Sequence, residues 1–296
     1  MRPGTLEAFA PAKVNLYLHV GASRPDGFHP ISSLMVFADV GDRLTAAPAE
    51  RLSLTVEGPM ADHAPPGEDN LVLRAARALA SNAGVAAPAL SLILEKSLPA
   101  AAGLGGGSSD AAAALRLVRR ALDLELDDGV LEEIAAGLGS DIPACVSGRP
   151  AIAEGRGERL RPGPELCPLP AVLVRPPVDS ATGAVYRAFD ADPAGANARP
   201  PELPARISTP GEAAAVFVRC RNDLEAPAVS LQPRIGEALA ELRAAPETLL
   251  GRMSGSGSAC FALCADAAAA QRLAGRLAAA HPDWWVTACH LGGPRG

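Results

Sequence analysis

The amino-acid sequence predicts a protein of the α+β class, organised as two lobes. Of its 296 residues, 48% are hydrophobic and 20% are charged. This hydrophobic content is enough to bury a core, and the chain is long enough for two domains of ordinary size. Segments with the period of a strand and segments with the period of a helix alternate along the chain, without an internal repeat. We expect the two domains at residues 1–155 and 156–296.

The first predicted element is a half-buried strand. Apolar and polar side chains alternate between residues 14 and 20, and Lys13 and Asn15 fall together on the polar face. A turn is expected at residues 24–27, where Gly27 supplies permissive dihedral angles.

Capping residues and apolar spacing predict the rest of the first half. Asn70 precedes an amphipathic run and should cap a helix. Strands are expected at residues 52–57 and 90–96, and helices at 71–79, from the glycine-rich stretch to about 122, and at 130–138. Pro143 favours an extended conformation for Ile142, which would put Asp141 at a break between a helix and a loop.

Short strands and helices also alternate in the second half. Strands are expected at residues 171–175, 259–264 and 284–290, and helices at 181–189, 234–245 and 267–280. The last strand, helix and strand form a compact β-α-β end. The stretch 191–210 is rich in Pro and Ala and is predicted to be a loop.

The charge pattern argues against a nucleic-acid partner. The formal net charge is −6 and the basic residues are scattered, whereas neutralising phosphates takes clustered Lys and Arg. Arg116, Arg119 and Arg120 are interpreted as one solvated helix face. We expect only small-molecule partners, and a monomer or a weak homodimer.

Cysteine usage and hydropathy argue against a zinc protein, a membrane-spanning protein and a secreted protein. The six cysteines form no CxxC pair and no His lies at finger spacing, which argues against a zinc site. Cys260 and Cys264 alternate with apolar residues and should be buried. The longest charge-free run, residues 78–94, is broken by Asn, Gly and Pro, and the start of the chain shows no secretion signal. Free thiols then suit a cytoplasmic protein.

A glycine-rich segment, Gly103-Leu104-Gly105-Gly106-Gly107-Ser108-Ser109-Asp110, lies between a predicted strand and a predicted helix. Residues without side chains let the backbone approach a phosphate, and the start of a helix adds a positive dipole. The segment is not a Walker A loop and lacks the spacing of a dinucleotide fold. The alternative is a flexible connector. Four glycines and two serines so close together in the sequence, between a predicted strand and a predicted helix, favour a phosphate-binding loop.

These residues resemble a motif of the GHMP kinases, which include homoserine, mevalonate and galactose kinases. In that group a Pro precedes Gly-Leu-Gly and Ser-Ser, here Pro99, Gly103-Leu104-Gly105 and Ser108-Ser109. Further segments narrow the resemblance to the diphosphocytidyl-methylerythritol kinases: Pro11-Ala-Lys13-Val-Asn15-Leu, Asp26-Gly27-Phe28-His29, Glu68-Asp69-Asn70-Leu71, Gly139-Ser140-Asp141-Ile-Pro143 and Arg252-Met-Ser254-Gly255-Ser256-Gly257. The matching order and spacing extend over essentially the whole chain.

The resemblance implies a fold and a reaction. The fold would pair an N-terminal lobe like domain 2 of ribosomal protein S5 with a C-terminal ferredoxin-like α/β sandwich. The reaction would be ATP-dependent phosphorylation of the 2-hydroxyl of a diphosphocytidyl methylerythritol, in the non-mevalonate route to isoprenoid precursors.

The resemblance also assigns the catalytic residues. Asp141 matches the family's catalytic Asp and would accept or orient the hydroxyl proton; the alternative is an ordinary turn or capping Asp. Lys13 matches the catalytic Lys and would stabilise charge on the transferred phosphoryl group. Asn15, on the same strand face, would bind the substrate near the same point. Simple solvent exposure of that face is the alternative.

The cytidine end of the substrate needs a stacking face and hydrogen-bonding groups. By resemblance, Phe28 would stack on the base and His29 would bind its edge; Tyr186 would be the second stacking ring, with Thr182 nearby. The family more often has Tyr at the position of Phe28, so any contact from a phenol hydroxyl is lost. Ordinary core aromatics and a structural histidine are the alternatives.

ATP would be held by the phosphate loop, with Asn70 and Lys96 on the adenine side. Asn70 also suits a helix cap, and the two roles are compatible. Mg²⁺ is expected with ATP, with Ser108 and Ser109 as plausible hydroxyl ligands, but no firm metal ligand is assigned. Ala144-Cys145 departs from the family, in which bulkier apolar residues are common there.

Three other functions remain open at this stage. The first is a GHMP kinase acting on homoserine or mevalonate, which would have no base for Phe28 and Tyr186 to stack on. The second is a related decarboxylase. The third is a nucleotide-binding regulator without turnover, against which the presence of both Lys13 and Asp141 argues.

Overall fold

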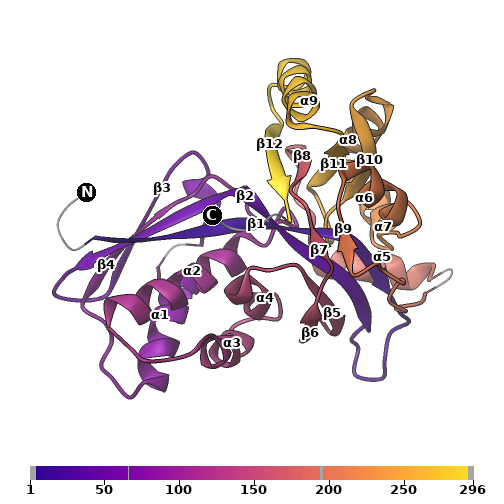
Figure 1. The fold of residues 1–296 in the computed structure, drawn as a ribbon. Helices are drawn as coiled ribbons and strands as arrows, with labels where there is room; N and C mark the ends of the chain where they lie inside the picture. The colour runs from indigo at the N-terminus through magenta and orange to yellow at the C-terminus, as the bar shows by residue number, and fades with distance from the viewer. Residues whose placement is uncertain (1–4, 66, 194–195, 293–296) are drawn as a thin grey trace. The chain divides into compact units, whose positions relative to one another are not determined.

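A computed structural model describes residues 5–65, 67–193 and 196–292 (Figure 1). The chain divides into two compact units made of interleaved stretches. Unit 1 takes its described residues from Met1–Ala12, Val40–Ala100 and Gly105–Gly148, and unit 2 from Lys13–Asp39, Ala101–Leu104 and Arg149–Gly296. Two long strands, β1 (Leu6–Val20) and β2 (Ile31–Pro48), contribute residues to both. The domain boundary at residue 155 stays a prediction.

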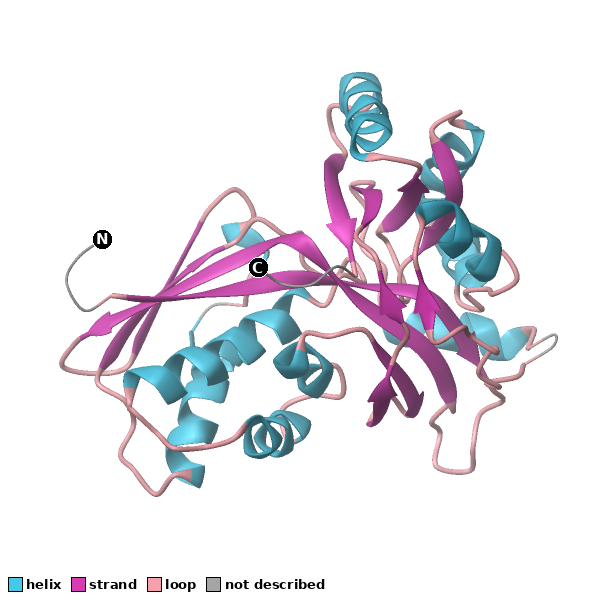
Figure 2. Cartoon of the chain, viewed as in Figure 1, coloured by secondary structure: helices cyan, strands magenta, loops and turns pink. Residues whose placement is uncertain are grey.

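Unit 1 combines a short sheet with four helices. Strand β4 (Leu90–Glu95) lies between β2, its antiparallel partner from Arg43 to Pro48, and β3 (Ser53–Glu57), its parallel partner. The helices are α1 (Leu71–Asn82), α2 (Gly106–Ala121), α3 (Asp128–Ala136) and α4 (Ile142–Ser147), with short 3-10 turns at Ala61–His63 and Gly67–Asp69. Within the unit, the four helices lie together on one side of its strands (Figure 2).

Unit 2 is organised around strand β8 (Leu169–Arg175), which pairs antiparallel with β11 (Cys260–Cys264) and β12 (Trp285–Leu291). The other strands are β5 (Ala151–Gly155), β6 (Arg159–Pro162), β7 (Glu165–Leu166), β9 (Arg206–Ile207) and β10 (Thr248–Met253), and the helices are α5 (Thr182–Ala191), α6 (Pro210–Phe217), α7 (Glu225–Leu231), α8 (Pro233–Ala244) and α9 (Ala267–Ala280). Aliphatic side chains of β8, α8 and α9 form much of its core, together with Cys260, Ala262 and Cys264 of β11.

The compact β-α-β end predicted from the sequence is confirmed. Helix α9 has the predicted bounds, and Asp266 begins it by accepting a hydrogen bond from the backbone N–H of Ala269 at 2.7 Å. The predicted cap of α1 is also confirmed, because the Asn70 side chain accepts from Val72 N–H at 3.0 Å. Among the described residues, 191–210 holds only the last residue of α5, the two-residue strand β9 and the start of α6; residues 194 and 195 lie outside that part.

The prediction of a half-buried first strand is wrong in one respect. Every residue of β1 from Ala10 to Val20 is buried, including those of the polar face. The polar side chains are covered because they bond to one another and to β2: Asn15 Nδ2 donates to Ser33 Oγ at 2.7 Å, and the hydroxyls of Tyr17 and Ser32 lie 3.1 Å apart. Burial raises the pKa of Tyr17 to about 12.

Two other local interpretations are corrected. Ile142 is helical rather than extended, because Pro143 lies in the first turn of α4, where its missing N–H would have no helical partner. Arg116 is not a solvated residue. Its guanidinium donates to the carbonyls of Cys145 and Val146 at the end of α4, at 2.9 and 3.2 Å, and to Phe9 O in β1 at 3.0 Å.

The sequence did not predict β2, although it has 18 residues. Asp39, Gly41, Asp42 and Arg43 interrupt its apolar pattern midway. Within the described parts of the chain, no helix is both long and apolar enough to cross a bilayer.

Candidate functional site

The phosphate-loop motif is divided between the two units, and its second part begins helix α2. Gly105 is the N-cap of α2 and has a left-handed backbone (φ 64°), which glycine adopts without strain. Gly106, Gly107 and Ser108 form the first turn, whose N–H groups have no partner within a helix. Gly107 is exposed and Ser108 half-buried. This end of α2 is therefore suited to an anion.

Lys96 lies beneath this turn in a buried cluster with Asp42 and Asp110. Its Nζ donates to Asp42 Oδ2 at 2.5 Å and to Asp110 Oδ2 at 2.8 Å, and the lysine is only 3% exposed. The other oxygen of Asp42 accepts from the N–H groups of Ser97 and Leu98 at 2.6 and 2.8 Å. Lys96 is thus fixed beside Gly106, where an added Cβ would come within 3.4 Å of Nζ.

The cluster contains two carboxyl groups and one cation, and this imbalance affects Asp110. Its Oδ1 has no hydrogen-bond partner among the residues that the structure describes. Burial raises the pKa of Asp110 to about 7, although the Lys96 ammonium opposes the rise. Burial lowers the pKa of Lys96, but the two carboxylates outweigh it, and the net shift is upward. The sequence did not single out Asp42 or Asp110.

Asp141 is the N-cap residue of α4. Its side chain makes no capping hydrogen bond to that helix, which sets it apart from an ordinary capping Asp. Arg116 holds the opposite end of α4, and Ser109 Oγ donates to Cys145 Sγ at 3.4 Å. Ser109, completely buried, and Cys145 thus connect α2 to α4.

In unit 2, Lys13 and Asn15 lie together as their spacing predicts. Lys13 Nζ donates to Asn15 Oδ1 at 2.9 Å. The backbone N–H of Asn15 donates to Ser254 Oγ at 3.1 Å, and that hydroxyl donates to Gly103 O at 3.0 Å. Lys13 N–H donates to Leu104 O at 2.8 Å. Lys13 and Asn15 are therefore held against the first part of the phosphate-loop motif, residues 101–104.

The C-terminal glycine segment, residues 252–257, packs against the same part of the motif. A Cβ at Gly103 would clash with the carbonyl oxygen of Ser254, so only glycine fits there (φ 72°). Ala259 N–H donates to Ala102 O at 2.9 Å. The hydroxyl of Ser256 lies 2.9 Å from Oγ1 of Thr182, one of the predicted substrate-binding residues.

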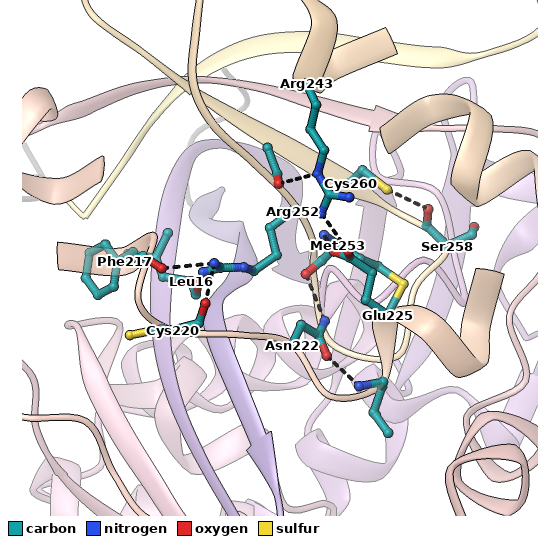
Figure 3. A network of polar contacts seen from close by, with 12 residues as sticks. Leu16, Phe217, Cys220, Asn222, Glu225, Arg243, Arg252, Met253, Ser258 and Cys260 are labelled. Atoms are coloured by element: carbon teal, nitrogen blue, oxygen red, sulfur yellow. Dashed lines mark hydrogen bonds and ion pairs between the residues drawn. The ribbon is translucent and has the colours of Figure 1, made fainter. Parts of the chain in front are cut away.

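Arg252 anchors this segment from within (Figure 3). The residue is 6% exposed, and its guanidinium donates to three backbone carbonyls, Leu16 O at 2.8 Å, Phe217 O at 2.9 Å and Cys220 O at 2.6 Å. Burial lowers its pKa. Asn222 adds bonds from Nδ2 to Met253 O and Gly255 O at 2.9 and 2.8 Å. Arg252 begins the C-terminal glycine motif that the sequence shares with the GHMP kinases, but neither strand β10 nor this network was predicted from the sequence.

The predicted base-binding residues lie on a turn and on helix α5. The turn is confirmed: Gly27 N–H donates to Arg24 O at 2.8 Å, with φ 80° at Gly27. Phe28 is 51% exposed. His29 is 8% exposed, with its ring 5.0 Å from that of Tyr186, between centroids.

His29 is also held at both ring nitrogens. Nδ1 lies 2.9 Å from Gly21 O, and Nε2 lies 3.3 Å from Asp190 Oδ1. The structure thus brings His29 together with Tyr186. It holds Asn70 and Lys96 in bonds within unit 1, where Asn70 Nδ2 also donates to Pro65 O at 3.0 Å. Pro99 is buried. The binding roles of all these residues stay predictions.

Comparison with known proteins gives a consistent result. The family model of the GHMP kinase N-terminal domain matches residues 70–149, and that of the GHMP kinase C-terminal domain matches residues 211–283. A protein of Caulobacter vibrioides (strain NA1000 / CB15N), named 4-diphosphocytidyl-2-C-methyl-D-erythritol kinase, is 57% identical over 97% of this chain and 99% of its own length. A Dinoroseobacter shibae protein of the same name is 47% identical over 96% of this chain and 95% of its own length.

Solved structures agree with this. A crystal structure of 4-(cytidine 5'-diphospho)-2C-methyl-D-erythritol kinase matches 98% of this chain and all of that one, with 37% identity and a TM-score of 0.81. A homoserine kinase from Cytophaga hutchinsonii, 17% identical with a TM-score of 0.69 over 100% of this chain and 98% of its own, shares the fold. The predicted α+β class and GHMP kinase fold are confirmed. The chain therefore belongs to the GHMP kinases and, within them, to the 4-diphosphocytidyl-2-C-methyl-D-erythritol kinases.

Proposed function

We propose that the chain transfers the γ-phosphoryl group of ATP to the 2-hydroxyl of 4-diphosphocytidyl-2-C-methyl-D-erythritol, giving the 2-phosphate and ADP in the non-mevalonate route to isoprenoid precursors. The observation that carries this proposal is the 57% identity, over 97% of the chain, to a curated kinase of that name. Lys13, Asn15, His29 and Asp141, which match the family's motif positions, and the aromatic ring of Phe28 support it.

Asp141 is the proposed base. Phosphoryl transfer asks the protein mainly for positioning and charge stabilisation, together with a group that accepts or orients the hydroxyl proton. The Asp141 side chain makes no capping hydrogen bond to α4, which argues against the alternative of an ordinary capping Asp. Arg116, at the other end of α4, keeps that helix fixed to α2 and β1.

Lys13 is proposed to stabilise negative charge on the transferred phosphoryl group. Its ammonium is oriented by Asn15 Oδ1, and its backbone by Leu104 O, so it is held in place before substrate binds. Asn15 is proposed to bind the substrate beside it. The serine hydroxyl of Ser254 fixes the Asn15 backbone in turn.

The phosphates of ATP are proposed to bind at the N-terminus of α2, with Pro99 and Leu104 shaping the loop and Asn70 and Lys96 on the adenine side. Mg²⁺ is proposed to enter with ATP and to neutralise charge on its phosphates. Of the two candidate hydroxyls, Ser108 fits this ion better, because Ser109 is completely buried and donates to Cys145. In the described residues, no group of three or more His, Cys, Asp or Glu could hold a metal.

The cytosine end is proposed to bind near Phe28, His29 and Tyr186, with Thr182 on the substrate side. His29 is already oriented by Gly21 O and Asp190, which limits its rotation. We also propose a cytoplasmic protein with small-molecule partners only, as a monomer or weak homodimer; all six cysteines are free thiols.

The test is ADP release with Mg-ATP and the cytidyl substrate, run beside homoserine and mevalonate. Wild type should turn over only the cytidyl substrate. Asp141→Asn should lower kcat by about 10²–10⁴-fold with ATP binding retained, the range of general acid–base catalysis. Glu133→Gln, on the neighbouring helix α3, is the matched control.

Other outcomes would replace the proposal. Turnover with homoserine or mevalonate would keep the kinase class and reject the cytidine site. ATP binding without turnover of any substrate would favour a nucleotide-binding regulator. Release of carbon dioxide from a phosphorylated acid would favour the related decarboxylase.

A further inference from the structure

The exposed ring of Phe28 is covered on one face by an arginine. The guanidinium carbon of Arg156 lies 4.1 Å from the centroid of the Phe28 ring, within the range of a cation–π contact. Half of the Phe28 side chain remains exposed. An exposed side chain normally rotates among several rotamers. The contact with Arg156 restricts the Phe28 ring to one orientation and leaves its other face open to a ligand.

Asp26 ties the ring and the guanidinium together. Its Oδ1 accepts from the backbone N–H of Phe28 at 3.0 Å, and its Oδ2 pairs with Arg156 Nη2 at 2.5 Å. The Phe28 N–H bond, followed by the Arg156 charge, lowers the pKa of Asp26. We call these three side chains, Asp26, Phe28 and Arg156, the base clamp.

The backbone of Arg156 is itself constrained. It lies at the tip of the hairpin between β5 and β6, flanked by Gly155 (φ 73°) and Gly157 (φ 105°), and its N–H donates to the carboxylate of Glu158. Both glycines have the left-handed backbone that other residues rarely adopt. The hairpin thus presents Arg156 to the loop of residues 24–28 in a defined direction.

We propose that Arg156 is a positioning residue for the nucleobase: it stacks on one face of Phe28 and, with Asp26, fixes the ring so that the opposite face receives the cytosine. The inference rests on the proposed function and deepens it. Phe28 lacks the phenol hydroxyl that the family more often has, so its ring has no hydrogen bond of its own to hold it. Stacking by Arg156 replaces that anchor and lowers the entropic cost of binding.

Steady-state kinetics of Arg156→Ala test this. KM for the cytidyl substrate should rise roughly 5- to 20-fold, while kcat and KM for ATP change less than about twofold. Arg156→Lys, which keeps the charge but not the planar group, should give an intermediate rise. Arg234→Ala is the matched control, because Arg234 is similarly exposed and also pairs with an Asp, Asp283, at 2.8 Å.

A double-mutant cycle separates this role from a structural one. If Arg156 acts through the Phe28 ring, Arg156→Ala should change KM by less than about twofold in a Phe28→Leu background. An equal rise in both backgrounds, or no rise in wild type, would overturn the proposal.

Calorimetric titration with cytidine 5'-diphosphate makes the inference independent of turnover. Tighter binding to wild type than to Arg156→Ala, by the same 5- to 20-fold, would support the base clamp even if the proposed reaction failed. Equal affinities, or no binding of this nucleotide by wild type, would reject the base clamp.

Discussion

In each unit a buried cation lies beside a glycine-rich segment, and these two cations, Lys96 and Arg252, are satisfied by different partners. In unit 1, Lys96 lies against two carboxylates, those of Asp42 and Asp110. In unit 2, Arg252 donates to three backbone carbonyls. Lys96 supports the first turn of α2, and Arg252 begins residues 252–257, so both cations hold backbone that the proposed reaction needs.

The partners decide how each cluster responds to pH. Carboxylates neutralise a buried cation but carry charge and titrate, and two around one ammonium leave a surplus negative charge. Carbonyls do not titrate, and a planar guanidinium with five donors can serve several of them at once. The stability contributed by the Lys96 cluster should therefore depend on pH. The stability contributed by the Arg252 network should instead depend on having a planar guanidinium donor at that position.

The largest effect is expected for Arg252→Ala. The substitution leaves the carbonyls of Leu16, Phe217 and Cys220 buried without this donor, and should reduce the free energy of unfolding by about 3–5 kcal/mol. Urea unfolding monitored by circular dichroism measures it, with Arg234→Ala as the exposed control. A loss below about 1 kcal/mol, or a loss that varies strongly between pH 5 and 8, would contradict the comparison.

The next effect is expected for Lys96→Met. Removing the ammonium leaves two buried carboxyls facing each other, and the free energy of unfolding at pH 7 should fall by about 2–4 kcal/mol. At pH 5 the loss should be smaller, because a carboxyl that takes up a proton no longer repels its neighbour. Parallel urea titrations at the two pH values give the answer. An equal loss at pH 5 and pH 7 is expected for Arg252→Ala. The same result for Lys96→Met would show that the two clusters do not differ in pH dependence.

The same two clusters show how far the sequence predicts the molecule. Helix α9 and the cap of α1 were predictable, since Asp266 and Asn70 act on residues two or three positions away. The pairing of Lys13 with Asn15 followed from the two-residue period of a strand. Such features depend only on neighbours in the chain.

Features that depend on distant partners were not predictable. Arg252 bonds to Leu16, 236 residues away, and Lys96 to Asp42, 54 residues away. Nothing local distinguishes these charged residues from solvated ones, as the wrong interpretation of Arg116 illustrates. Strand β2 was missed for the same reason: its charged middle is tolerated because Asp42 meets Lys96, a contact that exists only after folding.

The smallest effect is expected for Asp110→Asn, and it is a change of slope with pH. The pKa of Asp110 is raised from 3.8 to about 7, so the folded protein binds this proton more tightly than the unfolded chain. Its contribution to stability is therefore fully present below pH 3.8 and is lost as the pH rises through about 7. The amide of the variant cannot titrate. The stability of wild type minus that of the variant should fall between pH 4 and 7 and then level off.

Urea unfolding of both proteins at half-unit pH intervals measures this difference, and Asp192→Asn controls for the loss of an exposed carboxylate. A difference that rises with pH would mean that Lys96 holds Asp110 ionised in the folded state, with the pKa lowered instead of raised. The surplus charge would then have to be carried elsewhere in the cluster. A flat difference would mean that Asp110 Oδ1, which has no hydrogen-bond partner within the described part of the chain, costs the folded protein nothing in either protonation state. The contrast between carboxylate and carbonyl partners would then fail at its most sensitive point.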